Sequence, residues 1–144
     1  MKCDLNENEN DVLDLPSLEI VTFGESSFEK YRDEKLILST NSFNQLKSIT
    51  IGNECFKTVR EFVLDGLESL EIVKIGEKCF RISGDERDDG VCRITNCPNL
   101  RQLELGNKSF IDFKSFELSN LNSIQSIKFG EFCFKYADFS LKGE

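Results

Sequence analysis

Residues 67–80 read LESLEIVKIGEKCF, and the same arrangement of apolar residues, glycine and phenylalanine returns four more times along the chain. The shared pattern is L-x-x-L-x-x-V-x-I-G-x-x-[SC]-F, and a second short apolar alternation follows each copy. A repeat of this kind decides the architecture before any other signal. The first segments are LPSLEIVTFGESSF (15–28), FNQLKSITIGNECF (43–56), LESLEIVKIGEKCF (67–80), CPNLRQLELGNKSF (97–110) and LNSIQSIKFGEFCF (121–134); the second are KLILST (35–40), EFVLDG (61–66), VCRITN (91–96), SFELSN (115–120) and DFSLKG (138–143).

The glycines of the first segments set the length of the repeat. Successive glycines are 28, 24, 30 and 24 residues apart, which indicates a unit of about 24 residues with insertions at 29–35 and 81–91. A glycine that returns at one place in every unit favours a turn with positive φ or a close backbone approach. The five glycines are Gly24, Gly52, Gly76, Gly106 and Gly130.

Each apolar alternation has period 2, is rich in β-branched and aromatic residues, and is bounded by Gly, Asn, Ser or Asp, as is typical of strands. The chain is therefore predicted to be an all-β or mostly β solenoid, a right-handed coil of about five rungs, where one rung is one 24-residue turn of parallel strands. First strands are expected at about 19–23, 47–51, 71–75, 101–105 and 125–129, in one parallel sheet, and the second segments in an opposite, shorter sheet. Three columns are predicted to face inward: Val21, Ile49, Val73, Leu103 and Ile127; Phe23, Ile51, Ile75, Leu105 and Phe129; and Phe28, Phe56, Phe80, Phe110 and Phe134.

The repeat also divides the chain. Residues 1–14 are predicted to be an acidic N-terminal segment with a partial rung, because Val12 and Leu13 match Val63 and Leu64 of a second segment, and residues 15–144 form the five-repeat solenoid. An uncapped solenoid exposes the edges of its terminal rungs. At the last rung the side chains expected to be exposed are Phe129, Phe134, Phe139 and Leu141.

This pattern resembles that of a leucine-rich-repeat protein. The G-x-x-[SC]-F element, together with NCPNL at 96–100, is similar to the BspA-like (Treponema-type) class, although Ser or Cys replaces Ala before the Phe. Gly stands where the commonest leucine-rich repeats have the turn Asn. The resemblance implies an interaction scaffold, often on microbial cell surfaces, and it brings no catalytic residue.

Composition excludes several function classes. Lys and Arg number 18 against 26 Asp and Glu, so a net charge of −8 disfavours nucleic acid and anionic lipid as partners. The chain has no His, which removes the commonest general base and the usual partner of a Ser or Cys nucleophile. No apolar run is long enough to cross a bilayer, so no membrane insertion is expected. These features predict a protein that is not an enzyme and has no cofactor.

Five of the six cysteines are interpreted as core residues, and the sixth, Cys3, belongs to the N-terminal segment. Cys55, Cys79 and Cys133 stand in the column that holds Ser27 and Ser109, Cys92 matches Phe62, and Cys97 matches Leu67. Reduced thiols are favoured over disulfides, because side chains of adjacent parallel rungs place Cβ atoms wider apart than a disulfide prefers. Four converging zinc ligands are not available, so no metal site is predicted.

The outward strand positions are the candidate binding site. A neighbouring column, Glu19, Lys47, Glu71, Arg101 and Gln125, alternates in sign and is interpreted as structural. Two readings stay open for the outward positions: a stripe that binds a protein partner, or a merely solvated face. The stripe consists of Ile20, Thr22, Ser48, Thr50, Ile72, Lys74, Gln102, Glu104, Ser126 and Lys128.

The leading functional hypothesis is a non-enzymatic protein-interaction scaffold, a segment of a longer repeat array. The alternative is a structural solenoid that self-associates head to tail into a filament or surface component. A carbohydrate-active enzyme is disfavoured, because Glu104 stands alone in its column while hydrolysis needs two converging carboxylates. A cytoplasmic location is expected if the chain is complete, and a cell-surface or extracellular one if it is cut from a longer BspA-like protein.

Overall fold

Two parallel β-sheets form the molecule, as expected. The computed structural model describes residues 2–5, 18–26, 35–39, 43–57, 59–81, 90–134 and 138–142. In the order of their pairing, the strands of sheet A are β1 (Lys2–Leu5), β2 (Ile20–Phe23), β4 (Ser48–Ile51), β6 (Ile72–Ile75), β8 (Gln102–Leu105) and β10 (Ser126–Phe129). Those of sheet B are β11 (Asp138–Lys142), β9 (Phe113–Ser119), β7 (Gly90–Thr95), β5 (Glu61–Asp65) and β3 (Lys35–Ser39).

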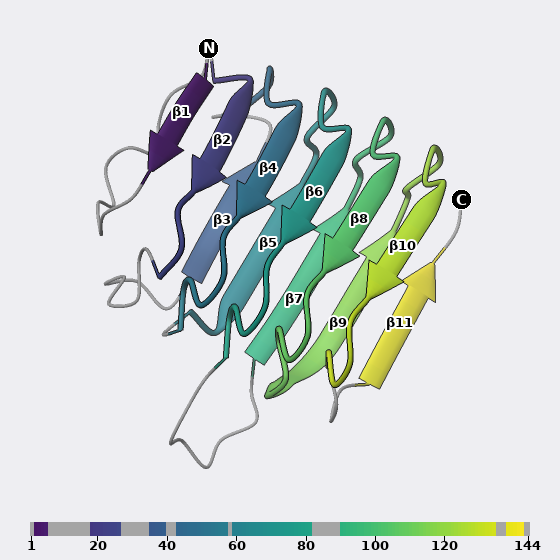
Figure 1. Cartoon of the computed structure of the whole chain (residues 1–144). Helices are drawn as coiled ribbons and strands as arrows, with labels where there is room; N and C mark the ends of the chain where they lie inside the picture. Colours follow the sequence, from purple (N-terminus) through teal and green to yellow (C-terminus); the bar gives the residue numbers. More distant parts are fainter. Residues whose placement is uncertain are drawn as a thin grey trace.

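The chain alternates between the two sheets and coils as a right-handed solenoid. In Figure 1 the strands of the nearer sheet run downward, those behind run upward, and successive rungs advance from left to right. Every pairing is parallel, and residues at the same position in successive units lie side by side, as Val21, Ile49 and Val73 do. Helices are absent from the described ranges, which therefore contain none that could cross a membrane.

The predicted inward columns form the core. Alternate residues of β2, β4, β6 and β8 face inward between the sheets, and all of them are buried. Phe62, Cys92 and Phe116 stack as one inward column of sheet B, which confirms that Cys92 is a core substitution. Cys97 is likewise fully buried at the position of Leu67.

Phenylalanine rings stack along the solenoid axis at the end of each first segment. Their centroids are 5.3 Å apart between Phe56 and Phe80, 4.6 Å between Phe80 and Phe110, and 4.9 Å between Phe110 and Phe134, with interplanar angles of 12° or less. The backbone at all four residues has positive φ, between 50° and 57°. A non-glycine residue accepts this conformation only when the surrounding structure holds it, and here a fully enclosed ring does so.

The glycine turns are explained by close approach and not by positive φ. A Cβ on Gly106 would lie 2.6 Å from the carbonyl carbon of Gly76, and a Cβ on Gly52 would lie 2.8 Å from the backbone nitrogen of Glu25. Of the described glycines only Gly66 has positive φ, at the other corner of the solenoid. The turns at Gly52, Gly76, Gly106 and Gly130 therefore lie directly against the backbone of the preceding rung.

A ladder of thiol and hydroxyl groups joins these turns. Cys55 Sγ donates to the carbonyl of Gly24 at 3.0 Å, Cys79 Sγ to Gly52 at 2.9 Å, and Cys133 Sγ to Gly106 at 3.0 Å. Ser109 Oγ does the same to Gly76 at 2.6 Å. The small residue before Phe56, Phe80, Phe110 and Phe134 is therefore a donor to the preceding turn, and all of these donors but Cys133 are fully buried. Cys55, Cys79, Cys92, Cys97 and Cys133 are free thiols.

Four expectations need correction. A sixth strand, β1, precedes the five predicted for sheet A, because Lys2–Leu5 pairs in register with β2 although its sequence is not that of the repeat. The sheet B strands are longer than those of sheet A, with five to seven residues against four. Phe134 is buried instead of exposed, because its ring stacks on Phe116 of sheet B at 4.1 Å. Ile127 belongs to an inward column, yet it is 45% exposed, because β10 is the last strand of sheet A among the described residues.

Several predicted features lie outside the described residues. They are Ser27, Phe28, the part of the N-terminal segment that follows β1, with Val12 and Leu13, and all but the edges of the two insertions. The side chains of Phe139 and Leu141 are outside as well.

Candidate functional site

The ten residues of the predicted outward stripe lie on one face, the outer surface of sheet A. Strand register divides them into two rows that cross the rungs. The first row is Ile20, Ser48, Ile72, Gln102 and Ser126, and the second row is Thr22, Thr50, Lys74, Glu104 and Lys128. All ten are at least partly exposed, so they form a continuous, mixed polar surface on rigid strands.

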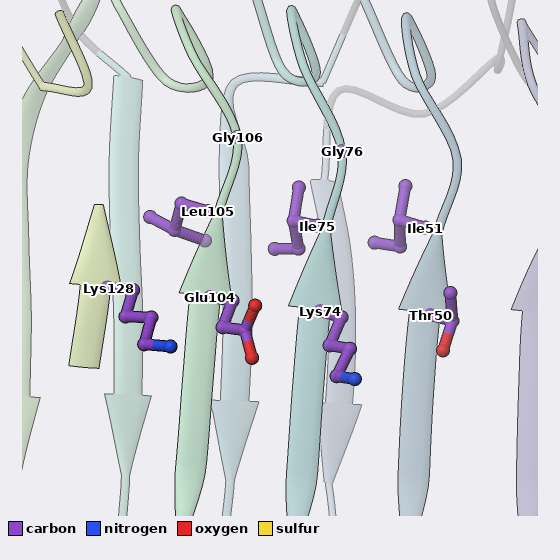
Figure 2. A pocket seen from close by; sticks show the side chains of 9 residues that line it. All are labelled: Thr50, Ile51, Lys74, Ile75, Gly76, Glu104, Leu105, Gly106 and Lys128. Carbon is purple, nitrogen blue, oxygen red and sulfur yellow. The ribbon is translucent and has the colours of Figure 1, made fainter. Parts of the chain in front are cut away.

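The second row borders a shallow depression of about 310 Å³. Figure 2 shows Thr50, Lys74, Glu104 and Lys128 in line across neighbouring strands, with Gly76 and Gly106 where the chain leaves the sheet. Gln102 Nε2 donates to Glu104 Oε2 at 2.6 Å, which fixes the carboxylate between the two lysines. Within the described residues neither Lys74 nor Lys128 has a carboxylate within 4.0 Å.

The neighbouring charged column is structural, as predicted. Lys47 Nζ lies 3.6 Å from Glu19 Oε1, and Arg101 Nη2 lies 3.0 Å from Glu71 Oε1. Each pair joins two adjacent rungs at the N-terminal end of the sheet A strands. Exposed pairs of this kind contribute little to the free energy of folding. The charged side chains of this column nevertheless already have partners within the chain.

Sheet B presents a different outer surface. Lys35 Nζ lies 3.8 Å from Glu61 Oε1, and Arg93 Nε lies 3.7 Å from Glu117 Oε1, so these basic side chains have carboxylate partners on the next rung. Lys114 on β9 is also exposed and has no carboxylate within 4.0 Å among the described residues, so unpaired basic side chains occur on both sheets. Sheet A carries two of them in one row, Lys74 and Lys128.

A row of polar side chains at the corner after sheet B was not predicted. Asn120 Nδ2 donates to Asn96 Oδ1 at 2.7 Å, and Asn96 Nδ2 donates to Asp65 Oδ1 at 2.9 Å. The row borders a second depression of about 320 Å³ with Gly66, Glu68, Pro98 and Asn122. The signal in the sequence is Asn or Gly at the end of four of the five second segments, since this corner needs positive φ at Gly66, Asn96 and Asn120.

Neither depression has the groups of an acid–base or nucleophilic mechanism. Glu104 is the single carboxylate bordering the first, and Glu68 the single one bordering the second. No three His, Cys, Asp or Glu side chains among the described residues could hold a metal ion. The chemistry available at both places is hydrogen bonding and charge pairing.

Burial makes the core thiols weak acids. Burial raises the pKa of Cys97 to about 11, mainly by desolvation, and it raises the pKa of Cys92 well above the ordinary value. The pKa of Cys79 is raised first by the hydrogen bond with the Cys55 thiol and then by burial. A thiol that stays protonated is a poor nucleophile and a poor metal ligand.

These shifts predict a loss of stability in alkali. Unfolded thiols ionise near pH 8.5 while the folded ones stay protonated, so the unfolded state binds fewer protons and the free energy of unfolding falls as pH rises. For Cys97 the fall spans about pH 8.5 to 11, with a slope approaching about 1.4 kcal/mol per pH unit. Urea unfolding across this range measures it, with Cys97→Ala as the control, whose slope is expected to be shallower by one thiol. Equal slopes in both proteins would contradict the assignment.

Comparison with known proteins adds no relative: no family model matches the chain, and neither a curated protein nor a solved structure matches it.

Proposed function

We propose that this solenoid is a non-enzymatic protein-interaction scaffold of the leucine-rich-repeat kind, similar to the BspA-like class, and that it binds a protein partner through the outward stripe of sheet A. One observation carries the proposal: Lys74 and Lys128 stand in one row on either side of Glu104, and neither has a carboxylate partner among the described residues. Two unpaired lysines beside a fixed carboxylate offer charged contacts to a partner without breaking any internal ion pair.

The rigidity of the stripe supports the same function. Apart from Ser126 and Lys128 on the edge strand β10, its side chains stand on strands that pair on both sides, and their alternate neighbours are buried in the core. A preorganised surface loses little conformational freedom when it binds. The absence of a base or nucleophile from both depressions fits a binding role and gives no support to an enzymatic one.

A paired charge reversal tests the proposal. The double variant Lys74→Glu, Lys128→Glu changes the stripe, and Lys35→Glu, Arg93→Glu makes the same charge change on sheet B as a control. Proteins that bind the purified wild-type chain are identified by crosslinking and mass spectrometry, and the affinity of each one is then measured. We expect the stripe variant to lose about tenfold or more in affinity, equivalent to about 1.4 kcal/mol, and the control to bind like wild type.

Two outcomes would overturn it. If every protein that is found binds the stripe variant as tightly as wild type, the stripe is not the binding surface. If no protein binds the wild-type chain, the scaffold role is wrong.

The structural alternative, a solenoid that associates with itself, has one observation in its favour. Apolar side chains of the last sheet A rung are half exposed, among them Ile127.

A further inference from the structure

The corner between each sheet B strand and the next sheet A strand carries side-chain amides that the outward stripe does not include. In Figure 1 this corner is the upper rim, where successive turns lie side by side. Asn96 and Asn120 form a row there through their hydrogen bonds to Asp65 and to each other. The depression of about 320 Å³ beside this row is bordered by four polar side chains and two small residues: Glu68, Asn96, Asn120, Asn122, Gly66 and Pro98.

The backbone of this corner does not need the amides. Asn96 N–H donates to Ser119 O at 3.0 Å, so the backbone groups of adjacent rungs pair with each other. At the corner after sheet A, by contrast, Asn53 Oδ1 and Asn107 Oδ1 each accept a backbone N–H of the next rung at 2.8 Å. Among the described residues, the side chains of Asn96 and Asn120 bond only to other side chains.

The carboxylate of Asp65 determines which way the amides of the row point. A carboxylate only accepts hydrogen bonds, so the group of Asn96 that faces it is Nδ2. Asn96 Oδ1 then faces Asn120, which donates its own Nδ2. Each of these bonds uses one amide hydrogen, so both asparagines keep a second N–H, and Asn120 keeps its carbonyl oxygen. The row therefore presents donors and an acceptor in fixed positions.

The other polar groups of the depression are also available to a ligand. Among the described residues, the side chains of Asn122 and Glu68 make no hydrogen bond or ion pair. Pro98 adds an exposed apolar ring, and no Lys, Arg or aromatic side chain is among the residues that border the depression. The surface is thus rich in amides, with one carboxylate and no basic group.

We propose that this depression is a second binding site, separate from the stripe of sheet A, and that its ligand is a neutral, extended polysaccharide that lies across the rungs. A sugar hydroxyl both donates and accepts, so two neighbouring hydroxyls pair with the N–H and the C=O of one amide, and the Glu68 carboxylate accepts from others. The C–H face of a sugar ring can lie on Pro98. Adjacent rungs are about 4.8 Å apart, close to the length that one pyranose ring adds to an extended chain, so consecutive sugars meet consecutive turns.

Other ligand classes fit this depression less well. An anionic sugar or a phosphate would meet the Glu68 carboxylate on a chain with a net charge of −8, and no basic side chain borders the depression. A metal ion would find no group of three ligating side chains among the described residues. An apolar ligand would cover the amides without pairing them, which costs free energy. Neutral hydroxyl groups match both the donors and the acceptors that are present.

Nuclear magnetic resonance of the nitrogen-15-labelled chain tests the proposal, because side-chain amides give their own signals. The probes are the β-1,4-linked hexasaccharides of glucose and of mannose, and hexagalacturonate is the anionic comparison. We expect a neutral hexasaccharide to shift the side-chain signals of Asn96, Asn120 and Asn122 saturably, and hexagalacturonate to bind about tenfold more weakly or less. If neither neutral probe gives a saturable shift, or if hexagalacturonate binds as tightly, the proposal is wrong.

Two variants locate the site. Asn120→Gly removes an amide without straining the backbone, since Gly66 already has positive φ at the equivalent place. Asn122→Ala removes an amide that makes no hydrogen bond within the described chain. Each is expected to weaken binding of the hexasaccharide about fivefold or more. Gln102→Ala, which removes an amide from the outer surface of sheet A, is the control and is expected to bind like wild type.

Urea unfolding checks that the three variants fold. If Asn120→Gly unfolds, Asn122→Ala still tests the site. Unchanged binding in the folded corner variants, or an equal loss in Gln102→Ala, would show that the saccharide does not bind in this depression.

Discussion

Replacing Phe80 with alanine is expected to lower the free energy of unfolding by about 3–5 kcal/mol. Phe80 is completely buried, and its ring contacts four others: Phe56, Phe62, Phe110 and Phe113, at centroid distances of 4.6–6.3 Å. The neighbouring rungs are held by their own strand pairing and cannot move into the space that the ring leaves. Much of the cost therefore comes from a cavity that stays open. A loss of this size is a large fraction of the stability of a typical domain, about 5–15 kcal/mol.

Urea unfolding measures the effect, and Phe132→Ala is the matched control. Phe132 is the same residue type, also at positive φ, but it is 50% exposed. The control is expected to lose less than about 1.5 kcal/mol, because less apolar area is removed from the core. Similar losses in the two variants would contradict the assignment of Phe80 to the centre of the stack.

The strands and the inward columns could be predicted because the same spacing of apolar residues occurs five times along the chain. Period 2 places Val73 and Ile75 on one face whatever their partners are, and identical spacing fixes the register of successive rungs. The same reasoning placed Cys92 and Cys97 in the core. β1 could not be found in this way, since KCDL pairs through its backbone without carrying the repeat.

The end of the solenoid could not be predicted residue by residue. The prediction that a column faces inward takes every rung to be covered by a rung on each side. The last described rung of sheet A has only one neighbouring strand, and Ile127 is therefore exposed. Phe134 is buried because Phe116 belongs to the other sheet, a contact between layers that no spacing along the sequence reveals. Exposure at an end depends on how the two sheets face each other.

The candidate site was predictable as a surface but not as a set of contacts. Alternation placed Lys74 and Glu104 on the outer face of sheet A, and the structure adds that Gln102 holds Glu104. Which basic residues have carboxylate partners depends on side-chain geometry between rungs. The row of Asn96 and Asn120 does not follow from the alternation of apolar residues, because that pattern shows only that a strand ends at this corner.

Replacing Gly106 with alanine is expected to destabilise the fold by about 1–3 kcal/mol or more, although such a change favours folding where space allows, by restricting the unfolded chain. The new Cβ would lie 2.6–2.8 Å from Gly76 C, Glu77 N and Gly76 O, all backbone atoms of the preceding turn. A side chain could rotate away, but these atoms are held by hydrogen bonds, among them Gly76 N–H to Ile51 O at 2.8 Å and Ser109 Oγ to Gly76 O at 2.6 Å. Relief would need the two rungs to separate, which would lengthen the bond from Gly106 N–H to Ile75 O as well.

The control is Gly66→Asn, because Gly66 has φ of 72° and the equivalent Asn96 and Asn120 have φ of 55°. That substitution puts into one unit the residue that two other units already have, so it is expected to change the free energy of unfolding by less than about 0.5 kcal/mol. Thermal or urea unfolding of the two variants separates the two demands on glycine in this solenoid: close approach at one corner and positive φ at the other. If Gly106→Ala were as stable as wild type, the turns could not lie as close together as the stacking of the rungs requires.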